Sequence, residues 1–327
     1  MAKLRLTAWF AVALALFPAL SVAQSTYPNR PVKVIVPFAP GGASDFVGRI
    51  MQPRLAELLG QQIVIENRGG AAGSIGVEVA ARAAPDGYTL LLGNVGSVAI
   101  NPGVFTKLSV NNLRDFIPVT QVVDVPGVLI VHPSVPVNTI KELVAYAKAN
   151  PGKLNYASPG SGSQNRLEME ILRKAEGGMD MVHVPYKGGA GPAVTGLIAG
   201  ETHMMFSTVS SALGHIKGGR LKALAVTSAK RLEPLPDVPT MKESGYSDGA
   251  SGSWQGVLVP AGTPREVVDR LYAIVVQTMK TPDVVERLAK GGAEAVTSAS
   301  PKAFADFVAA ETQRWGKVAK EAGATVD

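Results

Sequence analysis

Short runs of β-forming residues alternate with amphipathic helical stretches along most of the chain, and this alternation restricts the possible folds more than any other feature. Residues 32–38 are mostly apolar, and an apolar stripe at helical spacing follows them as far as Leu59. The same order recurs several times before residue 227. Strands that alternate with helices are typical of α/β folds, in which helices cover mostly parallel sheets. We therefore expect an α/β protein.

The pattern also predicts where the individual elements lie. Ser44 is a candidate N-cap of the first helix, Pro53 is expected to kink that helix, and Thr139 and Glu142 have the spacing of a capping box. Strands are expected at residues 32–38, 63–66, 89–93, 116–123, 127–131, 154–157, 181–184, 203–206, 221–227 and 254–259. Helices are expected at 44–59, 74–82, 140–150, 166–174, 192–199, 264–279 and 301–322.

The chain length of 327 residues suits two domains of ordinary size. Residues 231–253 are rich in Pro, Gly and Ser, which is typical of a connection between folded units. We expect one discontinuous domain made of residues 24–124 and 250–327 and a second made of residues 125–249, with a ligand cleft between them.

The N-terminus has the pattern of a secretory signal peptide. Lys3 and Arg5 precede an apolar run over residues 6–20, and Ser21 and Ala23 are small residues at the positions that a signal peptidase reads. A membrane anchor is the alternative, but the run is shorter than the about 20 residues that a spanning helix needs. We expect residues 1–23 to be removed and the mature protein, from Gln24 onward, to be periplasmic.

Composition excludes several classes of protein. The chain has no cysteine, which excludes disulfide scaffolds, thiolate zinc sites, iron–sulfur clusters and cysteine nucleophiles. Hydrophobic residues make up 46% and charged residues 18%, which argues against a disordered chain. The net charge is +6, but lysine and arginine are scattered among acidic residues, so we expect no nucleic-acid partner.

The usual catalytic motifs are missing from the sequence. There is no nucleotide P-loop and no G-x-S-x-G elbow, and the G-x-G-x-x-G pattern that begins at Gly160 fails at Asn165. No metal-binding spacing occurs among the four histidines, which are His132, His183, His203 and His215. The sequence thus predicts no enzyme, no cofactor and no metal site.

Three glycine-rich loops follow predicted strands and precede predicted helices, at residues 38–45, 158–163 and 185–189. Glycine allows a ligand to approach main-chain N–H groups, and the first N–H groups of a helix suit an anion. In open α/β sheets such loops gather at the carboxyl ends of the strands, where ligands bind. The alternative is that the glycines only make tight turns, so these loops alone indicate no more than a capacity to bind a small anion.

The sequence closely resembles the periplasmic solute-binding proteins of tripartite tricarboxylate transporters, also called the Bordetella uptake gene family. The resemblance covers nearly all of the expected mature chain, in family order. It rests on the final helix with Trp315 and on the motifs Y-P-N-R-P (27–31), V-P-F-A-P-G-G (36–42), V-I-E-N-R-G-G (64–70), P-D-G-Y-T-L (85–90), N-P-G-K-L-N-Y (150–156), H-V-P-Y-K-G (183–188), L-P-D-V-P-T (235–240) and P-A-G-T-P (260–264).

The resemblance implies a two-domain, flytrap-like periplasmic-binding-protein fold of type II that closes on a small organic carboxylate. It also implies delivery to integral-membrane permease subunits, and we expect a monomer. The ligand-binding residues that it implies are Phe38, Gly42, Ala43 and Asp45 on one jaw, Asn94 and Ser97 beside them, and Ser158, Gly160, Gly162, Ser163, Ser207 and Thr208 on the opposing jaw. For Asp45, a purely helix-stabilising role at the N-terminus is an equal alternative.

Three departures from the family pattern bear on the ligand. Ser207 stands where an Asp that can pair with an ammonium group is frequent, Asn165 where a His is common, and Thr195 where an Asp is frequent. These departures disfavour an amino acid and favour a carboxylate such as a dicarboxylate or an aromatic acid. Two other functions stay open, namely a receptor that presents its ligand to a sensor kinase and, less favoured, a periplasmic enzyme on the same scaffold.

Overall fold

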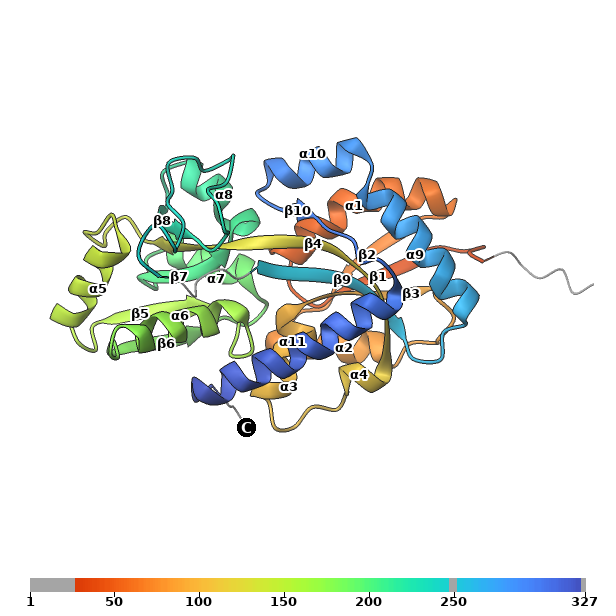
Figure 1. Cartoon of the computed structure of the whole chain (residues 1–327), viewed down its shortest axis with the longest axis horizontal. Coiled ribbons are helices and arrows are strands. Elements are labelled where there is room, and N and C mark those ends of the chain that lie inside the picture. The colour runs from red at the N-terminus through yellow and green to blue at the C-terminus, as the bar shows by residue number, and fades with distance from the viewer. Residues whose placement is uncertain (1–26, 247–251, 325–327) are drawn as a thin grey trace, which may run out of the picture.

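A computed structural model describes residues 27–246 and 252–324 (Figure 1). The predicted signal peptide, its cleavage before Gln24 and the predicted domain boundary at residue 250 lie outside the described residues. No helix in the described part of the chain is both long enough and apolar enough to cross a membrane.

The described strands form one mixed sheet in the order β2-β1-β3-β9-β4-β7-β5-β6, with β8 and β10 paired to β4. Parallel pairing joins β1 to β2 and β3, and β5 to β6 and β7, whereas every pair that involves β4 or β9 is antiparallel. The expected parallel pairing is therefore found among β1, β2 and β3 and among β5, β6 and β7. Strands β4, β8, β9 and β10 pair with other described strands only in antiparallel fashion. The strands are β1 (Val32–Val36), β2 (Ile63–Asn67), β3 (Thr89–Asn94), β4 (Phe116–Val131), β5 (Leu154–Ser158), β6 (Met181–Pro185), β7 (Met204–Thr208), β8 (Lys222–Val226), β9 (Gly252–Pro260) and β10 (Glu294–Ala295).

Strand β4 corrects one sequence prediction. Asp124, Val125 and Pro126 were expected to separate two strands, but Phe116–Val131 is one strand of 16 residues. The part up to Pro126 pairs with β9, and the part from Gly127 onward pairs with β7 and β8. Figure 1 shows this long strand running between the two halves of the molecule. The proline is tolerated because β4 changes partners next to it, between Pro126 and Gly127.

The helices of the βα units lie close to their predicted positions. Helix α1 continues through Pro53 as far as Leu59, and Thr139 caps α5 by accepting a hydrogen bond from the Glu142 N–H. Helices α8 and α10 and the short helices α3 and α4 were not predicted from the sequence. The helices are α1 (Ala43–Leu59), α2 (Ser74–Ala81), α3 (Asn101–Val104), α4 (Asn112–Asp115), α5 (Ile140–Ala149), α6 (Gln164–Ala175), α7 (Ala190–Ile198), α8 (Val209–Lys217), α9 (Arg265–Met279), α10 (Pro282–Lys290) and α11 (Pro301–Glu321), with a 3₁₀ turn η1 (Ala71–Gly73) and a π-helical turn η2 (Val95–Ile100).

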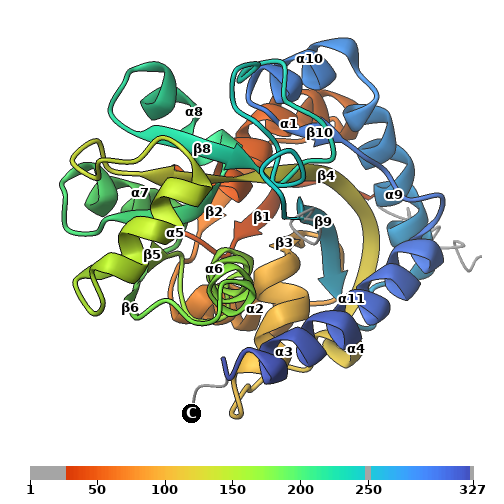
Figure 2. The same cartoon turned by 60° about the vertical axis from the view of Figure 1, so that its left-hand side comes forward.

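Hydrophobic cores lie on both faces of the sheet in each half of the molecule. In the half that contains β1, β3 and β9, Leu90 and Leu92 pack toward α1, α9 and α10, whereas Leu91 packs with residues of η2, α2 and α11 on the other face. Figure 2 shows α1 and α10 on one side of these strands and α11 on the other. In the second half, Leu129 faces one core and Val128 the other. Burial on both faces explains why the middle of β3, at residues 90–92, and the end of β4, at residues 128–131, are continuous apolar runs.

Helix α11 packs against the first half through an aromatic cluster. Phe304, Val308 and Trp315 are buried, whereas Phe307 is 37% exposed. The Glu311 carboxylate accepts hydrogen bonds from Trp254 Nε1 at 3.0 Å and Trp315 Nε1 at 2.9 Å. This contact fixes the C-terminal helix to strand β9.

Candidate functional site

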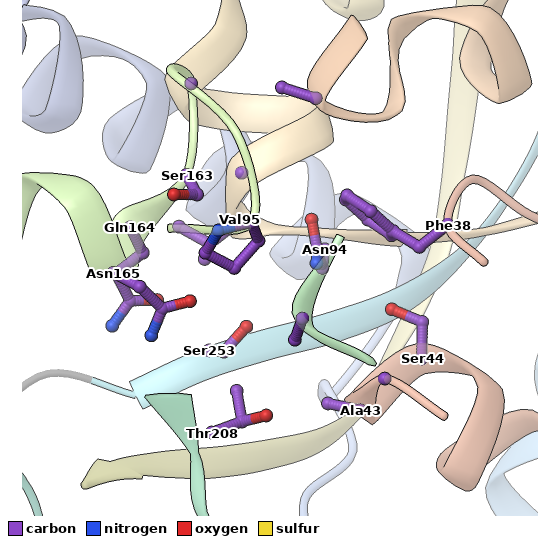
Figure 3. Close-up of a pocket in the computed structure, with 16 residues that line it drawn as sticks. Phe38, Ala43, Ser44, Asn94, Val95, Ser163, Gln164, Asn165, Thr208 and Ser253 are labelled. Atoms are coloured by element: carbon purple, nitrogen blue, oxygen red, sulfur yellow. The ribbon is translucent and has the colours of Figure 1, made fainter. Parts of the chain in front are cut away.

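A cavity lies between the two halves, with an empty volume of about 500 Å³ that includes its opening to solvent (Figure 3). Seven of the predicted site residues line it: Phe38, Gly42, Ala43, Asn94, Gly162, Ser163 and Thr208. The other lining residues are Ser44, Ala72, Val95, Gly96, Pro159, Gln164, Asn165, Ala190 and Ser253.

The cavity is built mainly from the beginnings of helices. The first residues of α1, η2, α6 and α7 and the N-cap residue of α8 all line it. The N–H groups at a helix start have no partner within the helix and lie at the positive end of its dipole, so they attract an anion. None of the described residues that line the cavity carries a charged side chain. Among the described lining residues, only backbone N–H groups and neutral polar side chains can therefore interact with an anion.

The N-terminus of α1 is open toward the cavity. Sequence analysis expected Ser44 to cap this helix, but the N-cap residue is Gly42, and no side chain caps the helix. Ser44 lies inside the helix, is 2% exposed, and its Oγ has no hydrogen-bond partner among the described residues. Figure 3 shows this hydroxyl turned toward the cavity. The missing cap leaves both the first N–H groups of α1 and the Ser44 hydroxyl for a ligand.

Asp45 does not line the cavity. Its carboxylate accepts a hydrogen bond from the Gly41 N–H at 3.1 Å and pairs with Arg49 Nε at 2.9 Å. Burial alone would raise the pKa of Asp45, but the hydrogen bonds from Arg49 and Gly41 outweigh it and hold this pKa below its ordinary value. Of the two roles considered for Asp45, the geometry favours stabilisation of the first loop.

Asn94 and Ser97 form a reciprocal cap at the start of η2. The Ser97 N–H donates to Asn94 Oδ1 at 2.9 Å, and the Asn94 N–H donates to Ser97 Oγ at 3.1 Å. Asn94 lines the cavity, whereas Ser97 is buried behind it. Because its oxygen is already bound to η2, Asn94 has its Nδ2 group left for a ligand.

The loop after β5 is shaped by Ser158. Its Oγ accepts the Gly160 N–H at 3.2 Å and lies 2.7 Å from His183 Nε2. Neither Ser158 nor Gly160 lines the cavity, so the structure places them as supports of the loop. Gly162 does line it, and a Cβ atom at that position would lie 2.0 Å from Asn101 Oδ1, so any larger residue would collide with α3.

Ser207 is fully buried in β7 and does not line the cavity. Its Oγ has no hydrogen-bond partner within residues 27–246 and 252–324. The next residue, Thr208, lines the cavity, and its hydroxyl lies 2.8 Å from Ser211 Oγ. Adjacent residues of a strand point to opposite faces, which explains why only one of the two reaches the site.

Sequence analysis did not assign Gln164, Asn165, Ser44, Ser253 or Ala72 to the site. Gln164 and Asn165 directly follow Ser163 at a predicted helix start, so their position was a usable signal. Ser253 is the second residue of β9, about ninety residues beyond the second loop along the chain, and nothing in the neighbouring sequence marks it as a site residue. Among the described residues, no group of three or more His, Asp or Glu side chains is arranged to hold a metal ion.

A two-sided α/β fold with an anion-attracting cavity between its halves defines a class, the solute-binding receptors. Residues 47–324 match the family model described as tripartite tricarboxylate transporter family receptor. The chain is 38% identical to protein BugT of Bordetella pertussis, over 94% of this chain and 93% of that protein. It is 39% identical to the protein encoded in the tcbD-tcbE intergenic region of Pseudomonas sp. strain P51, over 95% and 92%. The chain belongs to this family of periplasmic receptors, which are substrate-binding proteins and not enzymes, as the sequence predicted.

Solved structures agree with this assignment. The periplasmic binding protein BugD superposes with a TM-score of 0.87 at 38% identity, covering 91% of this chain and 99% of that one. Rpa4515 of Rhodopseudomonas palustris, solved with adipate, superposes with a TM-score of 0.87 at 35% identity, covering 91% of this chain and 98% of that one. MatC of the same organism, solved with bound malate, superposes with a TM-score of 0.83 at 33% identity, covering 89% of this chain and 99% of that one. The predicted fold class is thereby confirmed.

Proposed function

We propose that this protein captures a small organic carboxylate, preferably a dicarboxylate, and delivers it to the membrane subunits of a tripartite tricarboxylate-type transporter. One observation carries the proposal: five helical starts converge on a cavity whose described lining residues are all uncharged. A hydrogen bond from such an N–H group to a carboxylate oxygen contributes about 1.5–3 kcal/mol. Two solved relatives hold adipate and malate, which supports this ligand class.

We propose further that the two halves are domains that close over the ligand. We assign to one domain residues 24–124 with 250–327 and to the other residues 125–249, the bounds expected from the sequence. The partner exchange of β4 between Pro126 and Gly127 supports a hinge close to the first boundary. Closure would exclude water from the cavity and strengthen each hydrogen bond to the anion.

An amino acid is a poor candidate for the ligand, although for a different reason than the sequence suggested. Ser207 was the basis of that expectation, and it does not reach the cavity. The cavity lining disfavours an amino acid instead, because no described lining residue supplies a carboxylate that could contact an ammonium group directly. The backbone N–H groups at the helix starts can compensate a negative charge, whereas no described lining residue carries a negative charge that would compensate a positive one.

The proposal includes export to the periplasm after removal of residues 1–23. Mass spectrometry of the protein recovered from the periplasm should therefore give a chain that begins at Gln24. Recovery of the chain with residues 1–23 still attached, in the membrane fraction, would favour the anchor instead.

Ligand binding is tested with the purified mature protein. Thermal melting against a panel of dicarboxylates, aromatic acids and amino acids should show stabilisation by carboxylates, and calorimetric titration should then give a 1:1 complex. Deletion of the gene should abolish uptake of the same radiolabelled acid. Melting that no organic acid changes would contradict the binding function, and tight binding with normal uptake in the deletion strain would contradict the transport role.

A further inference from the structure

Two buried amide side chains at the start of α6 line the cavity with their nitrogen atoms turned away from it. Gln164 is 4% exposed and Asn165 is 8% exposed. Gln164 Nε2 donates to Glu168 Oε1 at 2.9 Å, and Asn165 Nδ2 donates to Glu168 Oε2 at 3.3 Å. Glu168 lies one helical turn further along α6 and is itself 6% exposed. One carboxylate therefore holds both amides.

This arrangement determines which end of each amide faces the ligand. Both amides direct their NH₂ groups at the Glu168 carboxyl oxygens, which accept from them. Their carbonyl oxygens remain for the cavity. Gln164 Oε1 is buried and has no hydrogen-bond partner among the described residues. Figure 3 shows the Asn165 oxygen turned toward the cavity and its nitrogen turned away.

The two sides of the cavity thus differ in their hydrogen-bonding character. The α1 side offers donors, namely open N–H groups and the unpaired Ser44 hydroxyl. The α6 side adds two carbonyl acceptors with a carboxylate behind them. A buried acceptor without a partner is unfavourable, and a ligand carboxylate placed against it would be repelled. The α6 side is therefore best matched by a ligand group that donates a hydrogen bond.

We propose that the ligand is a hydroxycarboxylate, whose carboxylate lies at the α1 side and whose hydroxyl donates to Gln164 Oε1 or Asn165 Oδ1. This inference rests on the proposed function and narrows its ligand class. A hydroxyl fits better than an ammonium group, because the Glu168 carboxylate is already shared between two amides and is separated from the cavity by them.

Matched pairs of acids test the proposal on the mature protein. Succinate and malate differ by one hydroxyl, as do glutarate and 2-hydroxyglutarate, and 3-phenylpropionate and phenyllactate; aspartate adds an ammonium group to succinate. Within a pair that binds, the hydroxylated acid should bind at least about tenfold more tightly in calorimetric titration, which corresponds to one satisfied buried hydrogen bond. Equal affinities within the pairs would overturn this inference and leave the carboxylate receptor intact. Aspartate binding more tightly than malate would assign the acceptors to an ammonium group instead. Binding of none of the acids would overturn the proposed function together with this inference.

Variants of Gln164 and Glu168 test whether the buried amides cause the preference for the hydroxylated acid. Glu168→Gln supplies a donor behind the amides and frees them to turn their NH₂ groups into the cavity, so the preference for the hydroxylated acid should fall to about twofold or less, or reverse. Gln164→Met removes the carbonyl acceptor with little change in side-chain volume. It should reduce the preference for the hydroxylated acid at least about threefold, which is part of the effect expected for one buried hydrogen bond. Gln277→Met, on the exposed face of α9, is the matched control and should leave the preference for the hydroxylated acid unchanged. Circular dichroism melting without ligand identifies a variant that fails to fold, and an undiminished preference in folded Gln164→Met and Glu168→Gln proteins would refute the assignment.

Discussion

The backbone N–H of Ala39 donates to the carbonyl oxygen of Gly188 at 2.8 Å, and this hydrogen bond joins the first glycine-rich loop to the third across the edge of the cavity. The two residues belong to opposite halves of the molecule. Glycines make the close approach possible, since a Cβ atom at Gly69 would lie 3.0 Å from the Ala39 nitrogen and 3.4 Å from the Gly188 Cα. The structure therefore has its halves in direct backbone contact beside the site.

A methyl group at Gly191 should hinder this contact. A Cβ atom there would lie 2.7 Å from the Pro40 carbonyl oxygen, in the opposite half, although the backbone of Gly191 is one that alanine adopts. Overpacking of this kind costs about 1–3 kcal/mol. We expect Gly191→Ala to lower ligand affinity about 5- to 100-fold in calorimetric titration, while the melting temperature without ligand stays the same or rises.

Gly214→Ala provides the control for Gly191→Ala. Gly214 also lies within a helix, α8, and apart from its chain neighbours and the nearby backbone of that helix no described atom lies within 4 Å of its potential Cβ. The Gly214→Ala variant should bind the ligand with the same affinity as the unmodified protein. Equal affinity of both variants would show that contact between the halves is not needed for binding.

Replacement of Asp45 should affect stability more than recognition. Asp45→Asn removes the charge that holds the Gly41 N–H and Arg49, at a cost of about 1–2 kcal/mol in the free energy of unfolding. Because the carboxylate does not line the cavity, ligand affinity should fall less than about tenfold. Chemical unfolding and calorimetry on the same sample measure both quantities. A loss of binding above a hundredfold with unchanged stability would instead mean that Asp45 contacts the ligand.

His183 should make the protein less stable in mild acid. Burial, together with the charges of Arg166 and Arg173, lowers its pKa from 6.5 to about 4. Between these values the unfolded chain binds a proton that the native protein does not, so stability falls as the pH falls from about 6.5 to 4. His183→Gln keeps a polar group near Ser158 and should lose less stability than the unmodified protein between pH 7 and pH 4.5. An equal loss of the free energy of unfolding by the two proteins between pH 7 and pH 4.5 would contradict the prediction.

Glu311 should matter for folding and not for the ligand. Glu311→Ala leaves the buried N–H groups of Trp254 and Trp315 without their acceptor, which should lower the free energy of unfolding by about 2–4 kcal/mol. Glu311→Gln retains an acceptor oxygen and should lose less. Ligand affinity should be unchanged in both, because α11 contributes no described residue to the cavity lining. Denaturant titration followed by tryptophan fluorescence measures the stability, and a loss of affinity in a folded variant would count against the assigned site.

Local sequence patterns were a good guide where one short segment contains the whole signal. Gly42 and Ser163 stand between a strand and the helix that follows, and both line the cavity. Thr208 lies in the same position before α8, although that helix was not predicted. The buried runs at β1, β3 and β5 were recognisable because burial on both faces leaves few polar residues to interrupt them.

The same patterns could not show which way a side chain points. Asp45 and Ser207 follow glycine-rich or strand-end motifs as the lining residues do, but one turns back to Gly41 and Arg49 and the other is enclosed in the sheet. The amides of Gln164 and Asn165 were equally ambiguous, because their orientation depends on Glu168 one turn away.

The sequence by itself determined the α/β class, the family and the two loops, at residues 38–45 and 158–163, that contribute to the cavity lining, because residue periodicity and glycine position act over a few neighbouring residues. Only the tertiary structure decided that β4 is one strand shared by both halves, that Ser253 on β9 joins the cavity, and that the first residues of distant helices converge there. These relationships depend on pairing between segments far apart in the chain, and nothing within a short segment specifies its distant partner.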